Sequence, residues 1–429
     1  MRVRGAVRPP GDKSISHRAL MLAALARGGG GGDTSELTGL LTGGDVKSTA
    51  RVLRQLGVEI AAIRESGAVT VHASRISRPS ARLHCGNSGT TARLLLGILA
   101  GQRFAATLTG DASLRRRPMR RVTEPLRAMG VQIEEGSGDL LPFSVRGGRL
   151  RSLTYTTPVA SAQVKSALLL AGITGDVSVS IREPYRSRDH TERLLVHLGL
   201  GLHERNGAIV FEPASRSVVP SFRLSVPGDA SSAAFLVGAA VLAEGGELLV
   251  ENVGVNPTRT GFLVVLERMG AQVERVNLRD EGGEPVADLI ARPPMGGLRG
   301  TEVSAAEVPT LVDEVPVLAA LASRVADGGE TVFREVGELR VKESNRLELI
   351  AANLRAVGAE AEARGNDLTV RGSPRPPRGR VDTARDHRLA MAFAVLGTVP
   401  GADVRLSERG SVAISYPRFF TDLRSISTT

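Results

Sequence analysis

Several short stretches of this 429-residue chain set cationic or hydroxyl side chains directly before an apolar run. The first reads PGDKSISHRALMLAALA and brings Lys13, Ser14 and Arg18 into the opening turns of an expected helix. Because a helix N-terminus presents free N–H groups and a partial positive charge, it attracts phosphate and carboxylate groups. For this cluster alone, capping and surface charge are the simpler explanation, so an anion site is indicated only if the pattern recurs.

The pattern recurs at GNSGTTARLLLG, where Asn87, Ser88, Gly89, Thr90 and Arg93 open an apolar run. This stretch is not a nucleotide-binding P-loop, because no Gly-Lys-Ser/Thr follows a strand. Nearby, SLRRRPMRR holds five arginines, for which a solvated basic loop and an anion contact both remain open. These arginines are Arg115, Arg116, Arg117, Arg120 and Arg121. A second anion-binding turn is therefore a candidate here.

Two further helix starts carry polar side chains in the middle of the chain. Ser161 and Gln163 begin SAQVKSALLLAG, in which we interpret Lys165 as an ordinary charge on the helix. The stretch SRDHTERL adds one cation and two residues that we interpret as local caps rather than catalytic groups. These three residues are Arg188, Asp189 and His190.

The C-terminal part of the chain supplies the carboxylates. Asp313 and Glu314 head the apolar run VPVLAALA, where N-capping is the simple interpretation. A carboxylate that faces an anion site is costly, and that cost often marks acid–base chemistry. Further charged groups in LRVKESNR and DHRLAMAFAVLG are Arg340, Lys342, Glu343, Arg346, His387 and Arg388. Together, the helix starts hold many cations and few carboxylates, which suits a cleft for two small anionic substrates.

The overall composition is that of a globular protein with excess positive charge. The formal net charge is +10, which indicates anionic partners. A basic nucleic-acid-binding repeat protein is one alternative, but aromatic residues make up only 3% of the chain and none interleaves with the basic stretches to stack on bases. The histidines are scattered without metal-ligand spacing, so no metal site is expected.

The cysteine content and the apolar runs bear on location. Cys85 is the single cysteine, so no intrachain disulfide is possible and a cytoplasmic protein is expected. No apolar run approaches the roughly 18 residues of a transmembrane helix, and no membrane partner is expected. The basic start and the short run Ala19–Ala26 imitate a signal peptide, but similar runs recur mid-chain, so cleavage is not expected.

The chain repeats one pattern of helices. Six apolar segments begin with small or polar residues and end near a glycine, which predicts six buried helices. Amphipathic segments alternate with them, stop at a glycine and continue as short strands, and the C-terminal FFTDLRSI resembles the opening of a truncated sixth copy. The stop glycines lie 69 to 88 residues apart and are Gly57, Gly130, Gly199, Gly270 and Gly358. The glycine run 28–32 is expected to form a flexible loop.

These stretches resemble the EPSP synthase family, the 3-phosphoshikimate 1-carboxyvinyltransferases. The matches include the stretches quoted above together with GDASLRRRPM and PGDASSAAFLVGAA, and they extend to residue 395. The form of SAQVKSALLLAG and SRDHTE is similar to the subgroup called class II. The resemblance implies a two-domain inside-out α/β barrel of six βαβαββ-type repeats, three per domain. It implies a first domain of residues 1–12 and 229–429, a second of residues 13–228, and substrates bound in the cleft between them.

The resemblance also implies a reaction. The enolpyruvyl group of phosphoenolpyruvate would move to the 5-hydroxyl of shikimate 3-phosphate, and phosphate would leave, in the pathway to chorismate and aromatic amino acids. Protonation of the enol carbon makes an electrophilic centre, the hydroxyl adds, and the tetrahedral intermediate eliminates phosphate. No cofactor, metal, nucleic acid or membrane is implied, and a monomer is expected.

Residue roles follow from the same resemblance. The residues expected to bind shikimate 3-phosphate are Lys13, Ser14, Arg18, Ser161, Ala162, Gln163, Arg188, Asp313 and Lys342. The residues expected to surround phosphoenolpyruvate are Lys13, Gly89, Arg117, Gln163, Arg346 and Arg388. Asp313 is the expected base for the 5-hydroxyl, and Glu343 and Lys13 are the candidates for proton transfer at the enol carbon.

Some positions depart from the family pattern or separate it from its relatives. Ile414 stands where many members carry a lysine, so one cation contact is missing. The nearest alternative, the transferase that acts on UDP-N-acetylglucosamine, usually has a cysteine in the loop matching GDASLRRRP, and this chain has none there. Glyphosate occupies the phosphoenolpyruvate region in the family, and because Gly89 is retained we expect inhibition, weakened by Leu94 and Ile414.

Overall fold

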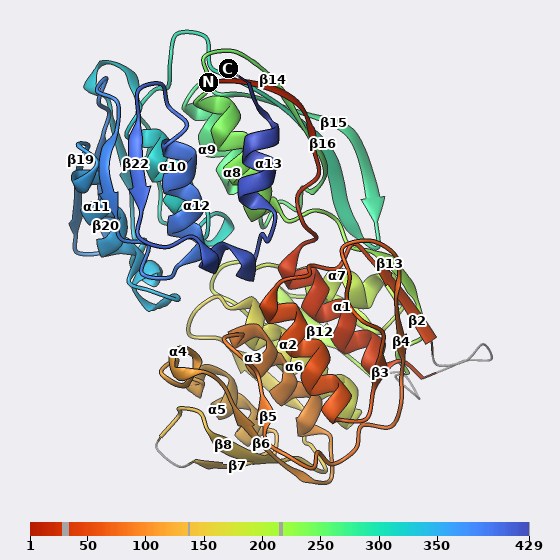
Figure 1. Cartoon of the computed structure of the whole chain (residues 1–429). Coiled ribbons are helices and arrows are strands. Elements are labelled where there is room, and N and C mark those ends of the chain that lie inside the picture. The colour runs from red at the N-terminus through yellow and green to blue at the C-terminus, as the bar shows by residue number, and fades with distance from the viewer. Residues whose placement is uncertain (28–33, 136–137, 214–217, 429) are drawn as a thin grey trace. The chain divides into compact units, whose positions relative to one another are not determined.

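The computed structural model describes residues 1–27, 34–135, 138–213 and 218–428. The chain divides into two compact units, coloured red to yellow-green and green to blue along most of their length (Figure 1). Unit 1 comprises Met1–Pro10, Pro227–Asp280 and Pro285–Thr429, and unit 2 comprises Gly11–Val226 and Glu281–Glu284. The glycine run 28–32, predicted to be a loop, lies outside the described residues.

Unit 2 contains three four-stranded sheets within its described residues, and all three have the same topology. In each, a parallel pair at one edge is followed by two antiparallel strands. The first sheet is β13 (Arg223–Ser225), β2 (Thr34–Thr38), β4 (Val69–His72) and β3 (Glu59–Ile60). The second is β5 (Leu83–His84), β6 (Ala105–Thr109), β8 (Phe143–Arg146) and β7 (Gln132–Glu135). The third is β9 (Leu153–Thr156), β10 (Val179–Arg182), β12 (Ala208–Phe211) and β11 (Leu202–Arg205).

Unit 1 uses the same arrangement for two of the three sheets that its described residues form. One is β17 (Glu302–Val303), β18 (Glu330–Phe333), β20 (Asp367–Arg371) and β19 (Glu360–Arg364). The other is β1 (Arg2–Val7), β14 (Gly246–Gly254), β16 (Glu284–Arg292) and β15 (Gln272–Glu281), extended by β23 (Ser427–Thr428) beside β1. The third is the parallel pair β21 (Arg378–Val381) and β22 (Asp403–Leu406). Six sheets, five of them sharing one strand order, confirm the predicted repeat.

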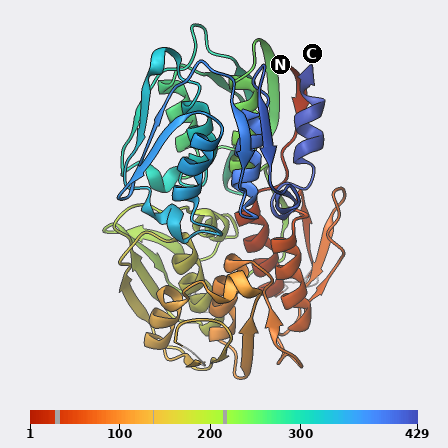
Figure 2. The same cartoon turned by 60° about the vertical axis from the view of Figure 1, so that its left-hand side comes forward.

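The six helices predicted to be buried all form, three in each unit. In unit 2 they are α1 (Lys13–Leu25), α3 (Gly89–Ala100) and α6 (Ala162–Gly175), and in unit 1 they are α8 (Ala230–Val241), α10 (Val315–Ala322) and α12 (His387–Leu396). Within each unit these helices pack against one another (Figure 2). Because their side chains are apolar on nearly all sides, only the interior of a unit can cover them.

The second set of helices alternates with the first, as the sequence predicted. These helices are α2 (Gly44–Gln55), α5 (Arg120–Ala128), α7 (His190–His197), α9 (Gly261–Arg268), α11 (Arg346–Ala356) and α13 (Phe419–Ser425). The chain leaves α2 and α5 through Gly57 and Gly130, whose φ angles of +94° and +105° favour glycine over any residue with a side chain. The C-terminal copy ends with α13 and the short β23, which confirms the truncated repeat.

Short helical turns complete the path of the chain. They are α4 (Ala112–Arg115) and the 3₁₀ turns η1 (Val308–Thr310), η2 (Ala326–Gly328), η3 (Gly337–Val341) and η4 (Gly410–Ile414). The turn η3 leads directly into the charged stretch that precedes α11, and α4 lies within the arginine-rich stretch. Each turn therefore shortly precedes predicted site residues, Lys342 and Glu343 after η3 and Arg117 after α4.

Candidate active site

The N-terminus of α1 is built as the sequence predicted. Asp12 caps the helix by accepting a hydrogen bond from the backbone N–H of Ile15 at 2.8 Å. This cap fixes Lys13 and Ser14 on the first turn, and Lys13 Nζ lies 3.0 Å from a carboxylate oxygen of Asp45. A cation is thus held beside the free N–H groups of the helix, which makes the turn suitable for an anion.

Arg18 is the most informative side chain of this turn, because it is a buried charge held by neutral groups. Its Nε donates to Thr191 Oγ1 at 2.7 Å, Nη1 to the Ser14 carbonyl at 2.9 Å and Nη2 to Ser166 Oγ at 2.8 Å. Among the described residues, no carboxylate oxygen lies within 4.0 Å of the guanidinium, which is 4% exposed. Burial lowers the pKa of Arg18 to about 10, so the group remains a cation at neutral pH. A buried cation without a carboxylate is stabilised strongly by a bound anion.

The N-terminus of α3 forms a second anion-binding turn. Ser88 caps it by accepting from the Thr91 N–H at 3.1 Å, and no described residue accepts from the backbone N–H groups of Gly89 and Thr90. Arg117 Nη2 donates to Asn87 Oδ1 at 2.7 Å beside this turn. Backbone N–H groups at a helix start and an adjacent guanidinium together favour the binding of an anionic group.

Gln163, at the start of α6, connects this turn to the next helix. Its Oε1 accepts from Arg93 Nη1 at 2.8 Å, and its Nε2 donates to Thr90 Oγ1 at 3.0 Å. The structure therefore brings Gly89, Arg117 and Gln163 together, as predicted for one substrate. In the arginine-rich stretch only Arg117 is half-buried, whereas its neighbours Arg115, Arg116, Arg120 and Arg121 are exposed.

The start of α6 depends on Glu183, a residue that the sequence did not single out. Its Oε1 accepts from the Ser161 backbone N–H at 3.0 Å and from Ser187 Oγ at 2.7 Å. Its Oε2 accepts from Lys165 Nζ at 2.8 Å and from the Ser187 backbone N–H at 3.2 Å. One carboxylate thus joins the cap of α6 to the loop that carries the half-buried Arg188.

The interpretation of Lys165 as an ordinary helix charge is wrong. The side chain is fully buried, and its Nζ lies 2.8 Å from Glu183 and 2.7 Å from Glu192. An ammonium group taken out of water needs such partners, since leaving it unpaired costs several kcal/mol. These partners are 18 and 27 residues away, so no local pattern revealed them.

The predicted catalytic groups of unit 1 also meet. Asp313 is 8% exposed and lies among three cations. Its Oδ1 is 3.4 Å from Arg346 Nη1 and 3.9 Å from Lys342 Nζ, and its Oδ2 is 3.6 Å from Arg388 Nη2. Glu343 Oε2 lies 2.6 Å from Arg346 Nη2. The carboxylates and cations that the sequence scattered over three stretches therefore form one cluster.

Asp386 orients the arginine at the centre of this cluster, and sequence reasoning missed it. It caps α12 and accepts from Arg346 Nε at 2.7 Å. Burial opposes the charge on Arg346, but Asp386, Glu343 and Asp313 outweigh that effect and raise its pKa. Burial likewise opposes the charge on Asp386, yet Arg346 and His387 outweigh it and lower its pKa. The guanidinium is therefore permanently charged and held in one orientation.

Simple capping does not explain Asp313, Glu314 or Asp189. Glu314 occupies the cap position of α10 without a capping bond, accepts from the Ser231 hydroxyl and lies 3.7 Å from Arg388 Nη1. Asp189 occupies the cap position of α7, also without a capping bond, and pairs with Arg193 at 3.0 Å. Asp386, by contrast, makes an ordinary side-chain cap, because it accepts from the backbone N–H of Arg388 at the start of α12.

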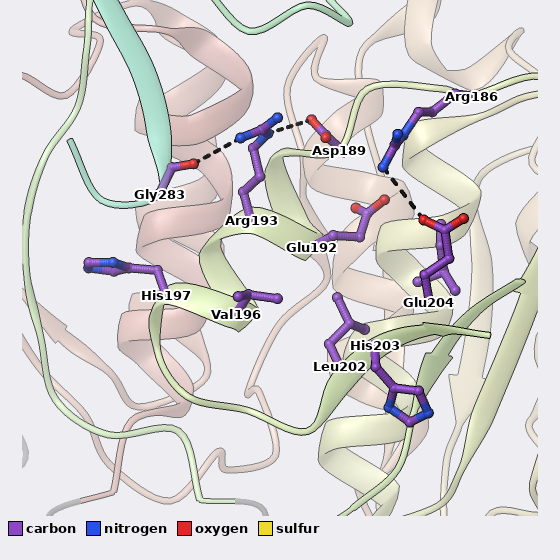
Figure 3. Close-up of a pocket in the computed structure, with 11 residues that line it drawn as sticks. Arg186, Asp189, Glu192, Arg193, Val196, His197, Leu202, His203, Glu204 and Gly283 are labelled. Atoms are coloured by element: carbon purple, nitrogen blue, oxygen red, sulfur yellow. Dashed lines mark hydrogen bonds and ion pairs between the residues drawn. The ribbon is translucent and has the colours of Figure 1, made fainter. Parts of the chain in front are cut away.

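A separate cavity of about 370 Å³ lies over α7 in unit 2 (Figure 3). Among its lining residues, Arg193 donates to a carboxylate oxygen of Asp189 and to the carbonyl of Gly283, and Arg186 lies 3.8 Å from Glu204. None of the residues predicted to bind substrate lines this cavity. Charges of both signs are paired within it, so it does not share the cationic character of the helix starts.

Other kinds of site find little support in the described part of the chain. No group of three or more His, Cys, Asp or Glu side chains is arranged to hold a metal ion. No helix is long and apolar enough to cross a membrane. Cys85 is buried, and burial raises the pKa of its thiol to about 12, so the thiolate needed for nucleophilic chemistry does not form at neutral pH.

Comparison with known proteins decides the family. The model of the family described as EPSP synthase (3-phosphoshikimate 1-carboxyvinyltransferase) matches residues 1–423. This chain belongs to the EPSP synthase family. As a member it transfers the enolpyruvyl group of phosphoenolpyruvate to the 5-hydroxyl of shikimate 3-phosphate and releases phosphate, in the shikimate pathway to aromatic amino acids.

Relatives and solved structures agree with this assignment to the EPSP synthases. A 3-phosphoshikimate 1-carboxyvinyltransferase of Thermus thermophilus is 50% identical over 98% of this chain and 96% of its own length. The 3-phosphoshikimate 1-carboxyvinyltransferase of Geobacillus kaustophilus is 46% identical over 99% of this chain and 98% of its own length. The solved EPSP synthase from Acinetobacter baumannii has a TM-score of 0.88 and 36% identity, covering 100% of this chain and 96% of that one. These structures confirm the predicted inside-out α/β barrel.

A more distant structure shares the fold alone. The enolpyruvyl transferase NikO from Streptomyces tendae has a TM-score of 0.79 at 20% identity and covers 99% of this chain and 95% of its own. The fold therefore persists where the sequence has diverged, so the fold alone does not identify the reaction, which depends on the side chains of the site.

Proposed function

We propose that two groups of side chains in unit 2 bind the two substrates of this EPSP synthase. Arg18, Ser161 and Arg188, with their neighbours Lys13, Ser14, Ala162 and Gln163, bind shikimate 3-phosphate. Gly89 and Arg117, with Gln163 and Lys13, bind phosphoenolpyruvate. The observation that carries the proposal is the buried Arg18 guanidinium, which has only neutral partners within the described chain. A phosphate or carboxylate group would supply the missing charge.

In unit 1, Asp313 is proposed as the base that accepts the proton of the 5-hydroxyl. The carboxylate oxygens of Asp313 lie 3.4 to 3.9 Å from the three cations, which would also hold an anionic substrate beside them. A carboxylate placed next to a substrate hydroxyl is the kind of group that accepts its proton in general-base catalysis. The cations Lys342, Arg346 and Arg388 are proposed to contact the same anionic substrates.

Glu343 and Lys13 are proposed to move the proton at the enol carbon. Each is charged and partnered, Glu343 by Arg346 at 2.6 Å and Lys13 by Asp45 at 3.0 Å. Both side chains are only partly buried, which leaves them accessible to a bound molecule. Protonation makes the centre electrophilic, the hydroxyl adds, and phosphate leaves from the tetrahedral intermediate.

Several finer properties belong to the same proposal. The stretches SAQVKSALLLAG and SRDHTE support assignment to class II. The division into two compact units supports the two proposed domains, 1–12 with 229–429 and 13–228, although unit 2 runs from Gly11 to Val226 and also includes Glu281–Glu284. A cytoplasmic location is proposed because Cys85 is the single cysteine and no intrachain disulfide can form. A monomer is proposed from the resemblance to the family alone.

Replacing Glu183→Gln tests the shikimate 3-phosphate assignment. Whichever way the amide is turned, its NH₂ group meets donors, either at Ser161 or at Lys165 and Ser187. Since hydrogen bonds to charged groups contribute about 1.5–3 kcal/mol, we expect the KM for shikimate 3-phosphate to rise about tenfold or more while the KM for phosphoenolpyruvate changes little. Steady-state kinetics with each substrate varied in turn measure both.

The matched control is Glu204→Gln, which alters an exposed ion pair with Arg186 in the same unit. It is expected to leave both KM values unchanged, because exposed pairs contribute little. An unchanged KM for shikimate 3-phosphate in folded Glu183→Gln protein would contradict the assignment.

Replacing Gly89→Ala tests the phosphoenolpyruvate assignment with glyphosate as the probe. The new methyl group would lie 2.8 Å from Arg93 Nη1 and 3.6 Å from Arg117 Nη1, so the Arg93 guanidinium must move. Overpacking costs about 1–3 kcal/mol, and we expect the inhibition constant for glyphosate to rise about fivefold or more. Inhibition is measured against varied phosphoenolpyruvate, with which glyphosate should compete in the wild type.

Gly148→Ala serves as its control, because the added carbon meets no atom within 4 Å. It should leave inhibition unchanged. If the wild type resists glyphosate as well as the Gly89→Ala variant does, then Gly89 does not determine sensitivity.

A further inference from the structure

His17 is a buried histidine that no step of the proposed reaction uses. It lies in α1 and is fully inaccessible to solvent. Its Nδ1 lies 2.7 Å from Thr49 Oγ1, whereas its Nε2 has no hydrogen-bond partner in the described part of the structure. Burial lowers the pKa of His17 to about 3, so the imidazole is neutral and carries one proton on one of its two nitrogens.

A chain of three hydroxyl groups leads from this histidine to the cap of α3. Thr49 Oγ1 lies 2.7 Å from Thr91 Oγ1, and Thr91 donates its hydroxyl proton to Ser88 Oγ at 2.7 Å. All four side chains are buried. The chain therefore links α1, α2 and α3 without water, and each contact needs one proton.

The positions of these protons follow from the last contact. The proton of Thr91 is used in the bond to Ser88, so Thr49 must donate in the contact between the two threonines. The proton of Thr49 is then used as well, and His17 must donate from Nδ1. The unprotonated nitrogen is Nε2, the atom that has no partner in the described structure.

This direction determines what the Ser88 hydroxyl can do. Its oxygen accepts from the Thr91 hydroxyl and from the Thr91 backbone N–H at 3.1 Å. Its own proton has no acceptor among the described residues, and the same holds for the backbone N–H groups of Gly89 and Thr90. The backbone N–H groups of a first helical turn normally lack an intrahelical acceptor, so the additional donor without an acceptor at this helix start is the buried Ser88 hydroxyl.

We propose that His17 is a positioning residue whose Nδ1–H tautomer directs the hydroxyl chain so that Ser88 donates to the anionic substrate bound at α3. The inference rests on the proposed function, because that substrate is taken to be phosphoenolpyruvate. With the opposite tautomer, Thr49 would donate to His17, Thr91 would donate to Thr49, and Ser88 would donate to Thr91. The Ser88 hydroxyl proton would then not be available to the substrate. The histidine acts only through Thr49 and Thr91 and touches no substrate.

Three variants separate this role from simple packing. His17→Leu removes the donor, and Thr49→Val interrupts the chain while keeping the shape of the side chain. His17→Asn keeps an N–H donor close to the position of Nδ1. Since one neutral hydrogen bond changes an equilibrium about 2- to 12-fold, we expect the KM for phosphoenolpyruvate to rise by such a factor in the first two variants. The KM for shikimate 3-phosphate should stay within about twofold, and His17→Asn should restore the KM for phosphoenolpyruvate.

The control variant is Thr107→Val, which breaks another hydroxyl pair of unit 2, the 2.8 Å contact with Ser144 between β6 and β8. It is expected to change neither KM. Thermal unfolding of each variant shows whether the fold is retained. If folded His17→Leu and Thr49→Val proteins bind phosphoenolpyruvate as the wild type does, the positioning role is wrong.

A further variant distinguishes failure of the positioning role of His17 from failure of the proposed function. Arg117→Gln should raise the KM for phosphoenolpyruvate whether or not the hydroxyl chain matters. An effect of Arg117→Gln without an effect of the chain variants overturns the role of His17 alone, whereas no effect of Arg117→Gln removes the substrate from this turn.

Nitrogen-15 NMR reads the tautomer directly. The chain has seven histidines, and the signal lost in His17→Asn identifies His17. We expect Nδ1 to be the protonated nitrogen at neutral pH. A protonated Nε2 with an unprotonated Nδ1 would overturn the inferred direction of the chain.

Discussion

Asp313→Asn is expected to lose about 10²- to 10⁴-fold in kcat, because the amide keeps the shape of the side chain but cannot accept the hydroxyl proton. The Asp313→Asn variant should still bind both substrates. The substitution removes one negative charge from beside Lys342, Arg346 and Arg388, which leaves these cations better able to hold anionic substrates. We therefore expect KM values that are unchanged or lower. Phosphate release under saturating substrates, together with calorimetric binding of each substrate, measures the two effects.

Asp367→Asn is the matched control, since it changes an aspartate of the same unit that pairs with Arg334 at the surface. It should turn over at close to the wild-type rate. Turnover within about threefold of wild type in Asp313→Asn would exclude Asp313 as the base, given the size of a normal general-base effect, and would direct attention to Glu343.

Arg18→Lys is expected to produce the second large effect, a loss of affinity for shikimate 3-phosphate. Lysine keeps the charge but cannot hold Thr191, Ser166 and the Ser14 carbonyl at the same time as a phosphate. Charge-assisted hydrogen bonds contribute about 1.5–3 kcal/mol, so the Kd should rise about 10- to 150-fold. Isothermal titration calorimetry with shikimate 3-phosphate measures it.

Arg54→Lys provides the comparison, because Arg54 also donates to neutral groups, the carbonyls of Ile60 and Ala61, but carries no proposed substrate contact. Its Kd should equal that of the wild type. Equal affinities in wild type and in a folded Arg18→Lys protein would remove Arg18 from the site.

The sequence was sufficient for the helices because their signals are local. The cap of α6 at Ser161 and the turn at Gly57 depend on neighbouring residues in the chain, and both form as predicted. The repeated order of apolar helix, outer helix and strand then determined the fold, since each apolar helix must be covered by other copies.

The partners of buried charges could not be predicted in the same way. Lys165 looked like a surface charge because Glu183 and Glu192 reach it only after the chain has folded back. The two hydroxyl partners of Arg18 come from α6 and α7, 148 and 173 residues away. Local sequence shows that a cation is present, whereas tertiary contacts decide whether it is already paired or still needs an anion.

Phosphate release in the presence of both substrates tests the central claim most directly. Purified protein is mixed with phosphoenolpyruvate and shikimate 3-phosphate, and phosphorus-31 NMR follows both substrates and products. We predict that one phosphate appears for each enolpyruvyl ether formed, and that neither substrate alone reacts. Release of phosphate without shikimate 3-phosphate, or transfer to UDP-N-acetylglucosamine in its place, would contradict the account.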